Sequence, residues 1–549
     1  MMLKLDRLSA SKSYVVSVFS YFCKFVLYRF ANDLDEELNI LQMIGAYTFI
    51  VGASVILTLI GLWRNKVLPN LFIILFTDIW IFANILYYSA NSIYLDWQII
   101  LCANNLLGFE DSIIAYLRWW MIIIPLLTIA IIYFLYFSKN VLLTSPLSKK
   151  YKLLILLSVI LIYTAGLALV KRGNYISDKD HPAFSINHDK NLYAKTLSPL
   201  GYFCYVIWEG LQDSFFQVKS VIPYSAQEEK VLSVICTDTV IPATPQGHLV
   251  FILVESFESW ALTAKDKYGN EVCENLNNFI RNNNVLLCTQ VFTQQKHGRS
   301  GDGQLITQTG LLPISTGVTC MKYGGNTYPN LAHFYSNGIV LNPYPGVWNQ
   351  KQTTYSYGYK RLREPPHIIK GTDSIIVKWA REELENVSVP TCVLAITINT
   401  HAPFTSVPAS MQFGDQYSSL EADYLQSAHY MDRHVGNFLA WADTATTMQN
   451  ATIVITADHN HFPRENGKGL CPLIIKSPDI TQSINIHAAY QMDIFPTVLH
   501  TIGQSNYAWH GFGVDLLDST AVRTISPEQA YVLSDKMIRT DFFNKLIKN

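Results

Sequence analysis

The stretch HLVFILVE at 248–255 decides the fold of the larger part of this chain. It is a continuous apolar run, rich in β-branched residues, that ends abruptly in an acidic side chain. Three similar runs follow along the chain: TCVLAITIN (391–399), ATIVITA (451–457) and LCPLIIK (470–476). Stretches with helical spacing lie between the runs, the clearest at 302–311 and 418–441. Buried strands alternating with helices indicate an α/β domain with a central, mostly parallel sheet covered on both faces.

A metal-binding or acid/base side chain follows three of these predicted strands. Glu255 comes directly after the first run, His401 follows the second, and Asp458 and His459 follow the third. In open α/β sheets, ligands bind outside the carboxyl ends of the strands. Any one of these residues alone would more often be a cap or a surface residue, but three successive strand ends together predict a site.

A serine in a glycine-rich segment is the fourth candidate. Ser300 lies within KHGRSGDGQ (296–304), just before the predicted helix at 302–311. Small residues allow close backbone approach, and a helix N-terminus presents unpaired N–H groups to an anion. A hydroxyl placed there can attack a phosphate, especially beside a divalent cation. Taken alone, Ser300 would be interpreted as a helix N-cap.

The composition points to a membrane-embedded first third. Half of the 549 residues are hydrophobic and 15% are charged, with a net charge of −1, whereas soluble chains carry about 25% charged residues. Residues 1–172 hold 14 Lys and Arg against 9 Asp and Glu, a net +5, and the remainder carries −6. The balanced total excludes a charge-driven nucleic-acid binder.

Five apolar stretches in this third are predicted to span a membrane, at about 13–30, 44–63, 71–88, 119–137 and 153–170. The first is the doubtful one, because it contains Lys24 and Arg29. With an inside N-terminus, however, basic residues fall on the inner loops and acidic residues on the outer loops. An odd number of spans then places everything after residue 172 outside the cytoplasm. Asp78, within the third span, is expected to face protein or water.

The expected organisation therefore has three parts. A five-helix transmembrane domain covers 1–172, a connector with little periodicity covers 173–245, and an extracytoplasmic catalytic domain covers 246–549. The predicted location is the cytoplasmic (inner) membrane, with several membrane passes.

The motifs as a set resemble the sulfatase-like branch of the alkaline phosphatase superfamily, and most of all the lipoteichoic acid synthases and phosphoglycerol transferases. The resemblance rests on VESFESW, GRSGDGQ, NTHAPF and ITADHNHF, and on TYPNL (327–331), VWNQ (347–350), YLQSAHYMD (424–432) and YQMDIFPTVLHTIG (490–503). It covers essentially the whole chain and is weakest over 173–245.

The resemblance implies one divalent metal ion held by four residues, Glu255, Ser300, Asp458 and His459. Such a mixed N/O set suits Mn²⁺, Zn²⁺ or Mg²⁺, and the resemblance favours Mn²⁺. It also implies that Ser300 is the nucleophile and that His401 contacts the phosphate or the departing and attacking oxygens. Substrate-binding roles are expected for Trp348 and Asn349, as well as for Arg299 and His401.

Three positions depart from the family pattern. The nucleophile is usually Thr but here is Ser300, which keeps the hydroxyl. An Arg that binds the head-group phosphate is replaced by Gln350, which removes a charge-assisted contact unless Arg299 or Lys351 compensates. A small residue two positions after the metal-binding histidine is replaced by His461. This residue could be an extra ligand or a proton carrier, but we expect it to be exposed or to lie behind the ligands. These changes leave the head group and the acceptor open.

The function that the resemblance implies is transfer of phosphoglycerol from phosphatidylglycerol, through a covalent Ser300 intermediate, to a hydroxyl of a glycan or polymer. The alternatives are a phosphoethanolamine transferase that uses phosphatidylethanolamine, a related phosphodiesterase or hydrolase, and a non-catalytic membrane sensor. A true sulfatase is disfavoured, because SGDGQ (300–304) lacks the Pro and Arg needed for formylglycine formation.

Nine cysteines are too few for a disulfide scaffold in a chain of 549 residues. Cys392 and Cys471 lie inside predicted buried strands and are expected to be free. Cys273, Cys288 and Cys320 are better candidates for pairing outside the cytoplasm.

Overall fold

The computed structural model describes residues 2–35, 38–61, 67–91, 94–101, 114, 116–134, 149–180, 190–215, 224–236, 244–315, 317–344, 346–365 and 372–544. Contacts divide the chain into two compact units. The first consists of Met1–Ile100 and Ile113–Gln217, and the second of Leu101–Ser112 and Val218–Asn549. The predicted connector, 173–245, is thus divided between the two units.

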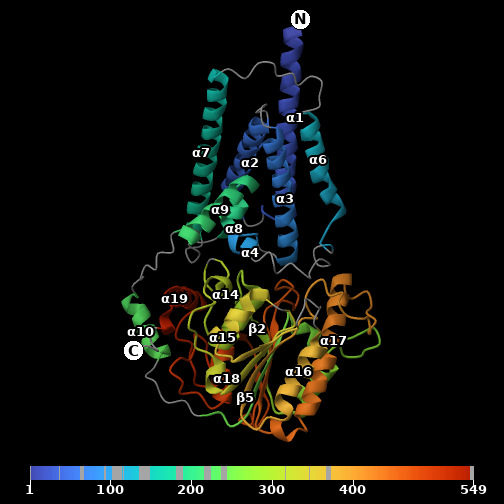
Figure 1. Ribbon diagram of the computed structural model, residues 1–549, viewed down its shortest axis with the longest axis vertical. Coiled ribbons are helices and arrows are strands. Elements are labelled where there is room, and N and C mark those ends of the chain that lie inside the picture. The colour runs from blue at the N-terminus through green and yellow to red at the C-terminus, as the bar shows by residue number, and fades with distance from the viewer. Residues whose placement is uncertain are drawn as a thin grey trace. The chain divides into compact units, whose positions relative to one another are not determined.

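The first unit is helical (Figure 1). Its helices are α1 (Met2–Ala31), α2 (Ile40–Gly61), α3 (Val67–Asn91), α4 (Trp97–Leu101), η2 (Trp119–Ile122), α6 (Ile123–Ile132), α7 (Lys149–Asp180), α8 (Lys190–Thr196) and α9 (Pro199–Phe215). The described parts of four predicted spans each lie in one helix, α1, α2, α3 or α7, whereas the span predicted at 119–137 is divided between η2 and α6 and continues to residue 134. Residues 62–63 and 135–137 lie outside the described residues. By length and composition, two described helical segments are suited to cross a membrane, Ile40–Ile60 and Leu71–Ser89.

A buried ion pair explains how α1 carries a lysine in the interior of the helical unit. Lys24 is fully buried, and its Nζ donates to Asp78 Oδ1 of α3 at 2.6 Å. Lys24 also donates to Thr128 of α6, which in turn donates to the second carboxylate oxygen of Asp78. The helices α1, α3 and α6 therefore share one buried, hydrogen-bonded ion pair. Asp78 faces protein, one of the two environments that we expected for it.

The second charge of α1 is neutralised in the same way. Arg29 is 1% exposed, and its guanidinium binds Asp35 through two nitrogens, one at 3.0 Å and the other at 2.5 Å. It also donates to the carbonyl of Lys195 at 2.7 Å, and Tyr47 donates to Asp35 at 3.0 Å. The two charges that made the first predicted span doubtful therefore both have partners inside the unit.

We expect Lys24→Met and Asp78→Leu, each made alone, to destabilise the helical unit by about 3–5 kcal/mol, because each leaves an uncompensated buried charge. The double variant removes both charges and should recover most of the loss. Thermal unfolding of the detergent-solubilised protein measures the three variants. A double variant whose loss equals the sum of the single losses would contradict this interpretation.

The second unit is built around one sheet. Its strands are β1 (Leu249–Val254), β2 (Leu286–Phe292), β3 (Asn337–Leu341), β4 (Arg361–Arg363), β5 (Thr391–Ile396), β6 (Thr452–Ala457), β7 (Cys471–Lys476), β8 (Ile484–Ile486) and β9 (Ala489–Tyr490). They are arranged in the order β4-β3-β5-β1-β6-β7-β2-β8, with β9 also paired to β2. Every residue of β1, β5 and β6 is buried, as expected for central strands covered on both faces.

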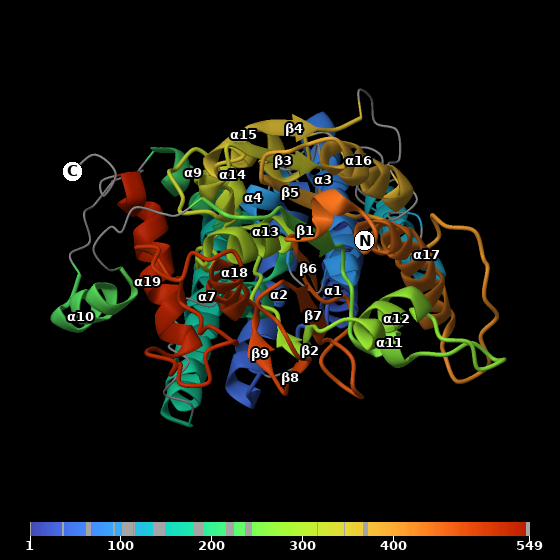
Figure 2. The same ribbon diagram turned by 90° about the horizontal axis from the view of Figure 1, so that it is seen from below.

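Helices cover the two faces of this sheet (Figure 2). One side carries α13 (Arg299–Thr309), α14 (Thr319–Lys322), α18 (Ile494–Thr501) and α19 (Pro527–Arg539); the other carries α11 (Trp260–Thr263), α12 (Glu274–Asn282), α16 (Asp373–Glu385) and α17 (Ser419–Ala442). The unit also contains α10 (Ala226–Ile235) and α15 (Gln350–Ser356). The helices predicted at 302–311 and 418–441 are confirmed as α13 and α17.

The sheet is mixed, and one predicted strand runs in the unexpected direction. The four predicted strands are confirmed as β1, β5, β6 and β7, but β7 is antiparallel to both β6 and β2. The other pairings are parallel. The connection from β6 to β7, residues 458–470, contains no helix, whereas neighbouring parallel strands are usually joined by a helical crossover.

Candidate active site

The strand register brings the predicted acidic residues together. In the parallel pairing of β1 with β6, Val254 lies opposite Ala457, so Glu255 and Asp458 are the next residues on neighbouring strands. The loop that carries His401 follows β5, the other neighbour of β1. Three of the predicted site segments therefore start at the same edge of the sheet.

Glu255, Asp458 and His459 form a buried cluster whose potential ligand atoms all lie within 4.8 Å of one another. His459 Nε2 lies 3.5 Å from Glu255 Oε1 and 3.7 Å from Asp458 Oδ2. One imidazole nitrogen and two carboxylates are a suitable ligand set for a transition-metal or Mg²⁺ ion.

Ser300 completes this cluster from the first turn of α13. Its Oγ lies 3.2 Å from Glu255 Oε2, to which it donates, and 3.3 Å from His459 Nε2. Gly303 makes this approach possible: a Cβ at that position would lie 2.4 Å from the carbonyl oxygen of Asp458. The glycine-rich segment thus lets α13 lie directly against the end of β6.

The polar atoms of the cluster are arranged to receive a cation. His459 Nδ1 lies 3.0 Å from the carbonyl oxygen of Asn460, which fixes the N–H on Nδ1 and leaves a lone pair on Nε2. Asp458 Oδ1 accepts from the N–H groups of Ser256 and His459 at 2.8 and 2.7 Å. Asp458 Oδ2 is buried and has no hydrogen-bond partner in the described part of the chain. A metal ion fits this oxygen and the Nε2 lone pair.

The electrostatics agree with that fit. Burial, together with the charge of Asp458, raises the pKa of Glu255 well above its usual value. Burial lowers the pKa of His459 to about 4, so its imidazole is neutral at pH 7, the form that binds a metal.

Sequence reasoning missed three residues that hold the metal-binding segments in place. Glu258 is fully buried and accepts from the N–H groups of His461, Phe462 and Gly469, at 2.8, 2.6 and 2.8 Å. Ser256 donates to Glu255 at 2.7 Å, and Gln491 donates to the carbonyl of Asp458 at 2.8 Å. Glu258 and Ser256 stand in VESFESW and Gln491 in YQMD, so the quoted motifs contained the signal.

Asp302 shapes the turn that presents Ser300. Its Oδ2 accepts from the N–H groups of Lys296 and Gly298, both at 2.9 Å. Burial raises its pKa to about 6. A Cβ at Gly298 would lie 2.2 Å from the other carboxylate oxygen of Asp302, so only glycine fits that position.

Backbone strain is concentrated at this site. Five non-glycine residues with φ between 43° and 66° belong to its loops: Ser256, Arg299, Trp348, Asn349 and Phe404. Such conformations cost about 1–3 kcal/mol each and persist where the surroundings impose them. The fold therefore fixes these loops at an energetic cost.

His401 and Arg299 lie beside the metal-ligand cluster. His401 is half-buried; burial lowers its pKa, which the charge of Asp458 partly offsets. Its Nδ1 lies 2.6 Å from the carbonyl oxygen of Ala402. Arg299 precedes Ser300, the predicted nucleophile, and its guanidinium has no ion-pair or hydrogen-bond partner in the described ranges of the chain, so its charge is available to an anion.

Trp348 and Asn349 reach the site from the turn before α15. A Cβ added to Gly301, the residue next to Ser300, would lie 3.5 Å from the Cβ of Trp348. Asn349 donates to the carbonyl of Cys320 at 2.8 Å. Gln350 is only 1% exposed, and its amide donates to Thr354 at 3.3 Å. Its side chain therefore points into the fold.

The other candidate for replacing the missing arginine is engaged elsewhere. Lys351 Nζ lies 3.7 Å from a carboxylate oxygen of Glu364. Of the two basic side chains considered for this role, Arg299 is thus the one whose charge is not already paired.

His461 is held edge-on between two aromatic rings. Its ring centroid lies 4.9 Å from that of Phe404 and 5.0 Å from that of Phe462. Burial lowers its pKa to about 3. It is not part of the group that could hold a metal ion, and its half-buried ring agrees with a position behind the ligands.

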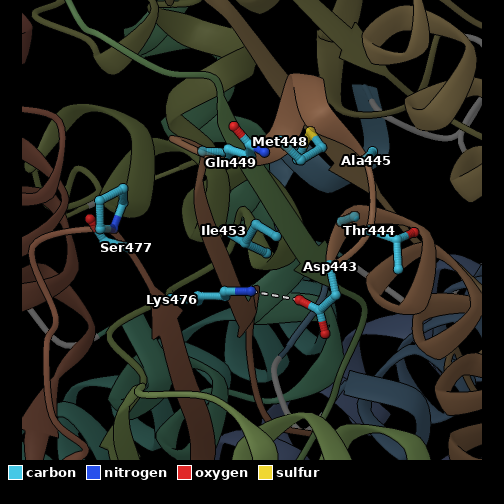
Figure 3. A pocket seen from close by; sticks show the side chains of 11 residues that line it. Asp443, Thr444, Ala445, Met448, Gln449, Ile453, Lys476 and Ser477 are labelled. Atoms are coloured by element: carbon cyan, nitrogen blue, oxygen red, sulfur yellow. Dashed lines mark hydrogen bonds and ion pairs between the residues drawn. The ribbon is translucent and has the colours of Figure 1, made fainter.

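A separate hollow lies at the opposite end of β6 (Figure 3). Its lining includes Ile453 at the start of β6 and Lys476 at the end of β7, which donates to Asp443 at 2.5 Å. None of the predicted site residues lines it. The predicted site is therefore distinct from this hollow.

No disulfide joins the cysteines of the described residues. Cys392 and Cys471 are buried in strands as predicted. The expectation that Cys273, Cys288 or Cys320 forms a disulfide is wrong for the described residues; all three thiols are buried in the fold.

Comparison with known proteins places the chain in a family. Residues 248–504 match the sulfatase family, and residues 2–219 match the lipoteichoic acid synthase N-terminal domain. The chain is 23% identical over 553 residues to lipoteichoic acid synthase 1 of Bacillus subtilis (strain 168), with 92% of this chain and 84% of that protein covered. Residues 2–219 thus belong with the lipoteichoic acid synthase N-terminal domains and residues 248–504 with the sulfatase family.

Two further comparisons agree with this family. The lipoteichoic acid synthase of Staphylococcus saprophyticus is 21% identical over 480 residues, covering 80% of this chain and 73% of that protein. Among solved structures, the integral membrane lipooligosaccharide phosphoethanolamine transferase A of Neisseria meningitidis matches with a TM-score of 0.53 and 13% identity, covering 91% of this chain and 95% of that chain. At that identity, the likeness concerns the fold.

Proposed function

We propose that this member of the lipoteichoic acid synthase family is a membrane-bound, metal-dependent transferase. It moves phosphoglycerol from phosphatidylglycerol to a hydroxyl of a glycan or polymer, through a covalent intermediate on Ser300. The observation that carries the proposal is the meeting of Ser300 Oγ with Glu255 and His459 at 3.2 and 3.3 Å, beside the partnerless Asp458 Oδ2.

Glu255, Ser300, Asp458 and His459 would hold one divalent metal ion, with Mn²⁺ favoured over Zn²⁺ and Mg²⁺ by the family. When bound, such an ion lowers the pKa of a nearby hydroxyl and neutralises charge on phosphate oxygens. The natural metal is settled by measuring which ion copurifies with the protein.

In the first step, Ser300 Oγ, which has already released its proton to solvent, attacks the phosphorus of the lipid head group. A Ser300–phosphorus bond forms, the bond from phosphorus to the diacylglycerol oxygen breaks, and the leaving oxygen takes a proton from His401. In the second step an acceptor hydroxyl gives its proton to His401 and attacks the phosphodiester, and Ser300 Oγ leaves in its deprotonated form. His401 assists first the leaving oxygen and then the entering hydroxyl as a general acid and base.

Recognition of the donor is assigned to the side chains around Ser300. Arg299, which has no ion-pair partner in the described ranges, supplies a cation for the phosphate. Trp348, which lies beside Gly301, and Asn349 contact the head group together with His401. A phospholipid donor also suits a site attached to a membrane domain, because the diacylglycerol product stays in the bilayer.

The proposed location is the cytoplasmic membrane, with five spans, an inside N-terminus and the catalytic unit outside the cytoplasm. The internal pairing of Lys24 and Arg29 supports α1 as a span, since the cost of a charge in a membrane falls when it is paired inside the protein.

A lipid-turnover assay tests the proposal. Detergent-solubilised protein is incubated with Mn²⁺ and labelled phosphatidylglycerol or phosphatidylethanolamine. Diacylglycerol should be released from phosphatidylglycerol, and label should pass to an added glycan. Release from phosphatidylethanolamine alone would favour phosphoethanolamine transfer. Release without transfer to any acceptor would favour a hydrolase, and no turnover with any divalent metal would exclude the enzyme reading.

A further inference from the structure

Two threonines of the loop that carries His401 are hydrogen-bonded to the backbone of Glu255, one of the proposed metal ligands. Thr397 Oγ1 accepts from the N–H of Glu255 at 3.2 Å. Thr400, directly before His401, donates through its hydroxyl to the carbonyl of Glu255. Thr397 and Thr400 are therefore both hydrogen-bonded to the backbone of Glu255, the proposed metal ligand that follows β1.

The same loop is also hydrogen-bonded to the start of α16. Asp373 is fully buried, and its Oδ1 accepts from the N–H groups of Ile398 and Asn399 at 2.7 and 3.1 Å. Asn399 returns the bond: its Oδ1 accepts from the N–H of Asp373 at 2.7 Å. Asn399 also donates to Ser406 at 3.3 Å. This bond joins a residue before His401 to a residue after it.

Asp373 does not act as an ordinary helix cap. It is the first residue of α16, where an acidic side chain usually serves its own helix, yet its hydrogen bonds in the described structure go to the His401 loop. Its second oxygen is buried without a hydrogen-bond partner in the described ranges, and burial raises its pKa to about 6. Burying a carboxylate at this position costs free energy, and a simple turn would not require a carboxylate there.

We infer that Asp373 and Asn399 form a clamp that positions His401 against the reacting oxygens, so that both are positioning residues for the transfer reaction. The inference rests on the proposed function for its kinetic part. The clamp acts through the loop backbone, because its hydrogen bonds are made by residues 398 and 399 and not by the His401 side chain.

The chain offers a matched control at Asp432. This carboxylate is also fully buried, and it accepts from the N–H groups of Asn275 and Leu276 at 3.0 and 2.8 Å and from the Asn275 amide at 2.8 Å. It fastens the start of α12, which carries no site residue. Asp432→Ala therefore removes three such hydrogen bonds, one more than Asp373→Ala, at a place away from His401.

The kinetic test compares Asp373→Ala with Asp432→Ala in the lipid-turnover assay. Asp373→Ala should lower kcat about 10- to 100-fold, the usual loss when a supporting contact is removed, with KM for the lipid and affinity for Mn²⁺ unchanged. Asp432→Ala should leave kcat unchanged. Asp373→Asn keeps an acceptor oxygen and should restore most of kcat. In a His401→Ala background, Asp373→Ala should cost nothing further, whereas additive losses would overturn the clamp.

Hydrogen exchange gives a readout that does not depend on turnover. Asp373→Ala should speed amide exchange at Ile398 and Asn399, and Asp432→Ala should speed it at Asn275 and Leu276 instead. Asn399→Ala serves as the second variant if Asp373→Ala does not fold. Unchanged protection at 398–399 would overturn the clamp even if lipid turnover is confirmed. Absence of turnover in the unmodified protein would overturn the proposed function alone, because exchange still tests the clamp.

Discussion

Ser300→Ala is expected to abolish release of diacylglycerol, with a loss of about 10⁴-fold or more, as for removal of a nucleophile in other covalent mechanisms. The hydroxyl lies 3.2 Å from Glu255 and 3.3 Å from His459, and no other hydroxyl-bearing residue joins this cluster from the N-terminus of a helix in the described structure. Intact-mass analysis of the unmodified protein, quenched during turnover, should show a phosphoglycerol adduct that Ser300→Ala lacks.

Ser300→Thr is the matched control for this prediction. It restores a hydroxyl at the same position, and the family pattern has threonine there, so we expect turnover and the adduct to survive. Ser300→Ala should also keep the fold, since only one oxygen is removed. An adduct that persists in Ser300→Ala, or turnover close to that of the unmodified protein, would exclude Ser300 as the nucleophile.

The site was predictable from the sequence because parallel strands align their carboxyl ends. The long apolar runs before Glu255 and Asp458 are recognisable without any structure. Once they pair in register, with Val254 opposite Ala457, the residues that follow must be neighbours. The helix at Ser300 was recognisable for a similar reason, since glycine spacing and helical periodicity are both local signals.

The elements that escaped prediction lack such local signals. The strands β3, β4, β8 and β9 are short, and in β4, Arg361–Arg363, two of three residues are charged. The longer β2, Leu286–Phe292, was missed because its residues are only partly buried and form no continuous apolar run. The direction of β7 depends on how the chain returns from β6, which an apolar run alone does not reveal. Glu258 and Asp373 act by accepting N–H groups distant in sequence, so their roles appear only after the chain has folded.

The family resemblance added what local reasoning could not, namely the roles of Trp348 and Asn349. Trp348 lies near Gly301, and it and Asn349 have φ of 52° and 55°, a left-handed conformation that is unusual for tryptophan. At the position of the departure, the Gln350 side chain is buried and donates to Thr354 within α15.

Asp458→Asn is expected to lower affinity for Mn²⁺ more than about 100-fold, beyond the 10- to 100-fold loss typical of residues that only support a ligand, and to abolish turnover with it. The amide can keep the carbonyl that accepts from Ser256 and His459, so the loop should survive. It would, however, place an N–H₂ group where the partnerless Oδ2 now faces the cluster. Isothermal titration with Mn²⁺ measures the loss. Asp432→Asn, at an equally buried carboxylate, should leave the affinity unchanged.

The same site sets the pH dependence of metal binding. Because burial and the charge of Asp458 raise the pKa of Glu255, the metal-free protein holds a proton there above the usual range, and binding must displace it. Affinity should therefore rise by about tenfold per pH unit up to that raised pKa and then level off.

In the metal-free protein, the stability that the protonated Glu255 contributes is complete below its unfolded pKa and is lost as pH rises through the folded pKa. Added Mn²⁺ should thus raise the Tm of the unmodified protein most at neutral pH and not that of Asp458→Asn. An unmodified protein whose Tm and turnover are indifferent to both chelator and Mn²⁺ would contradict a metal at this cluster.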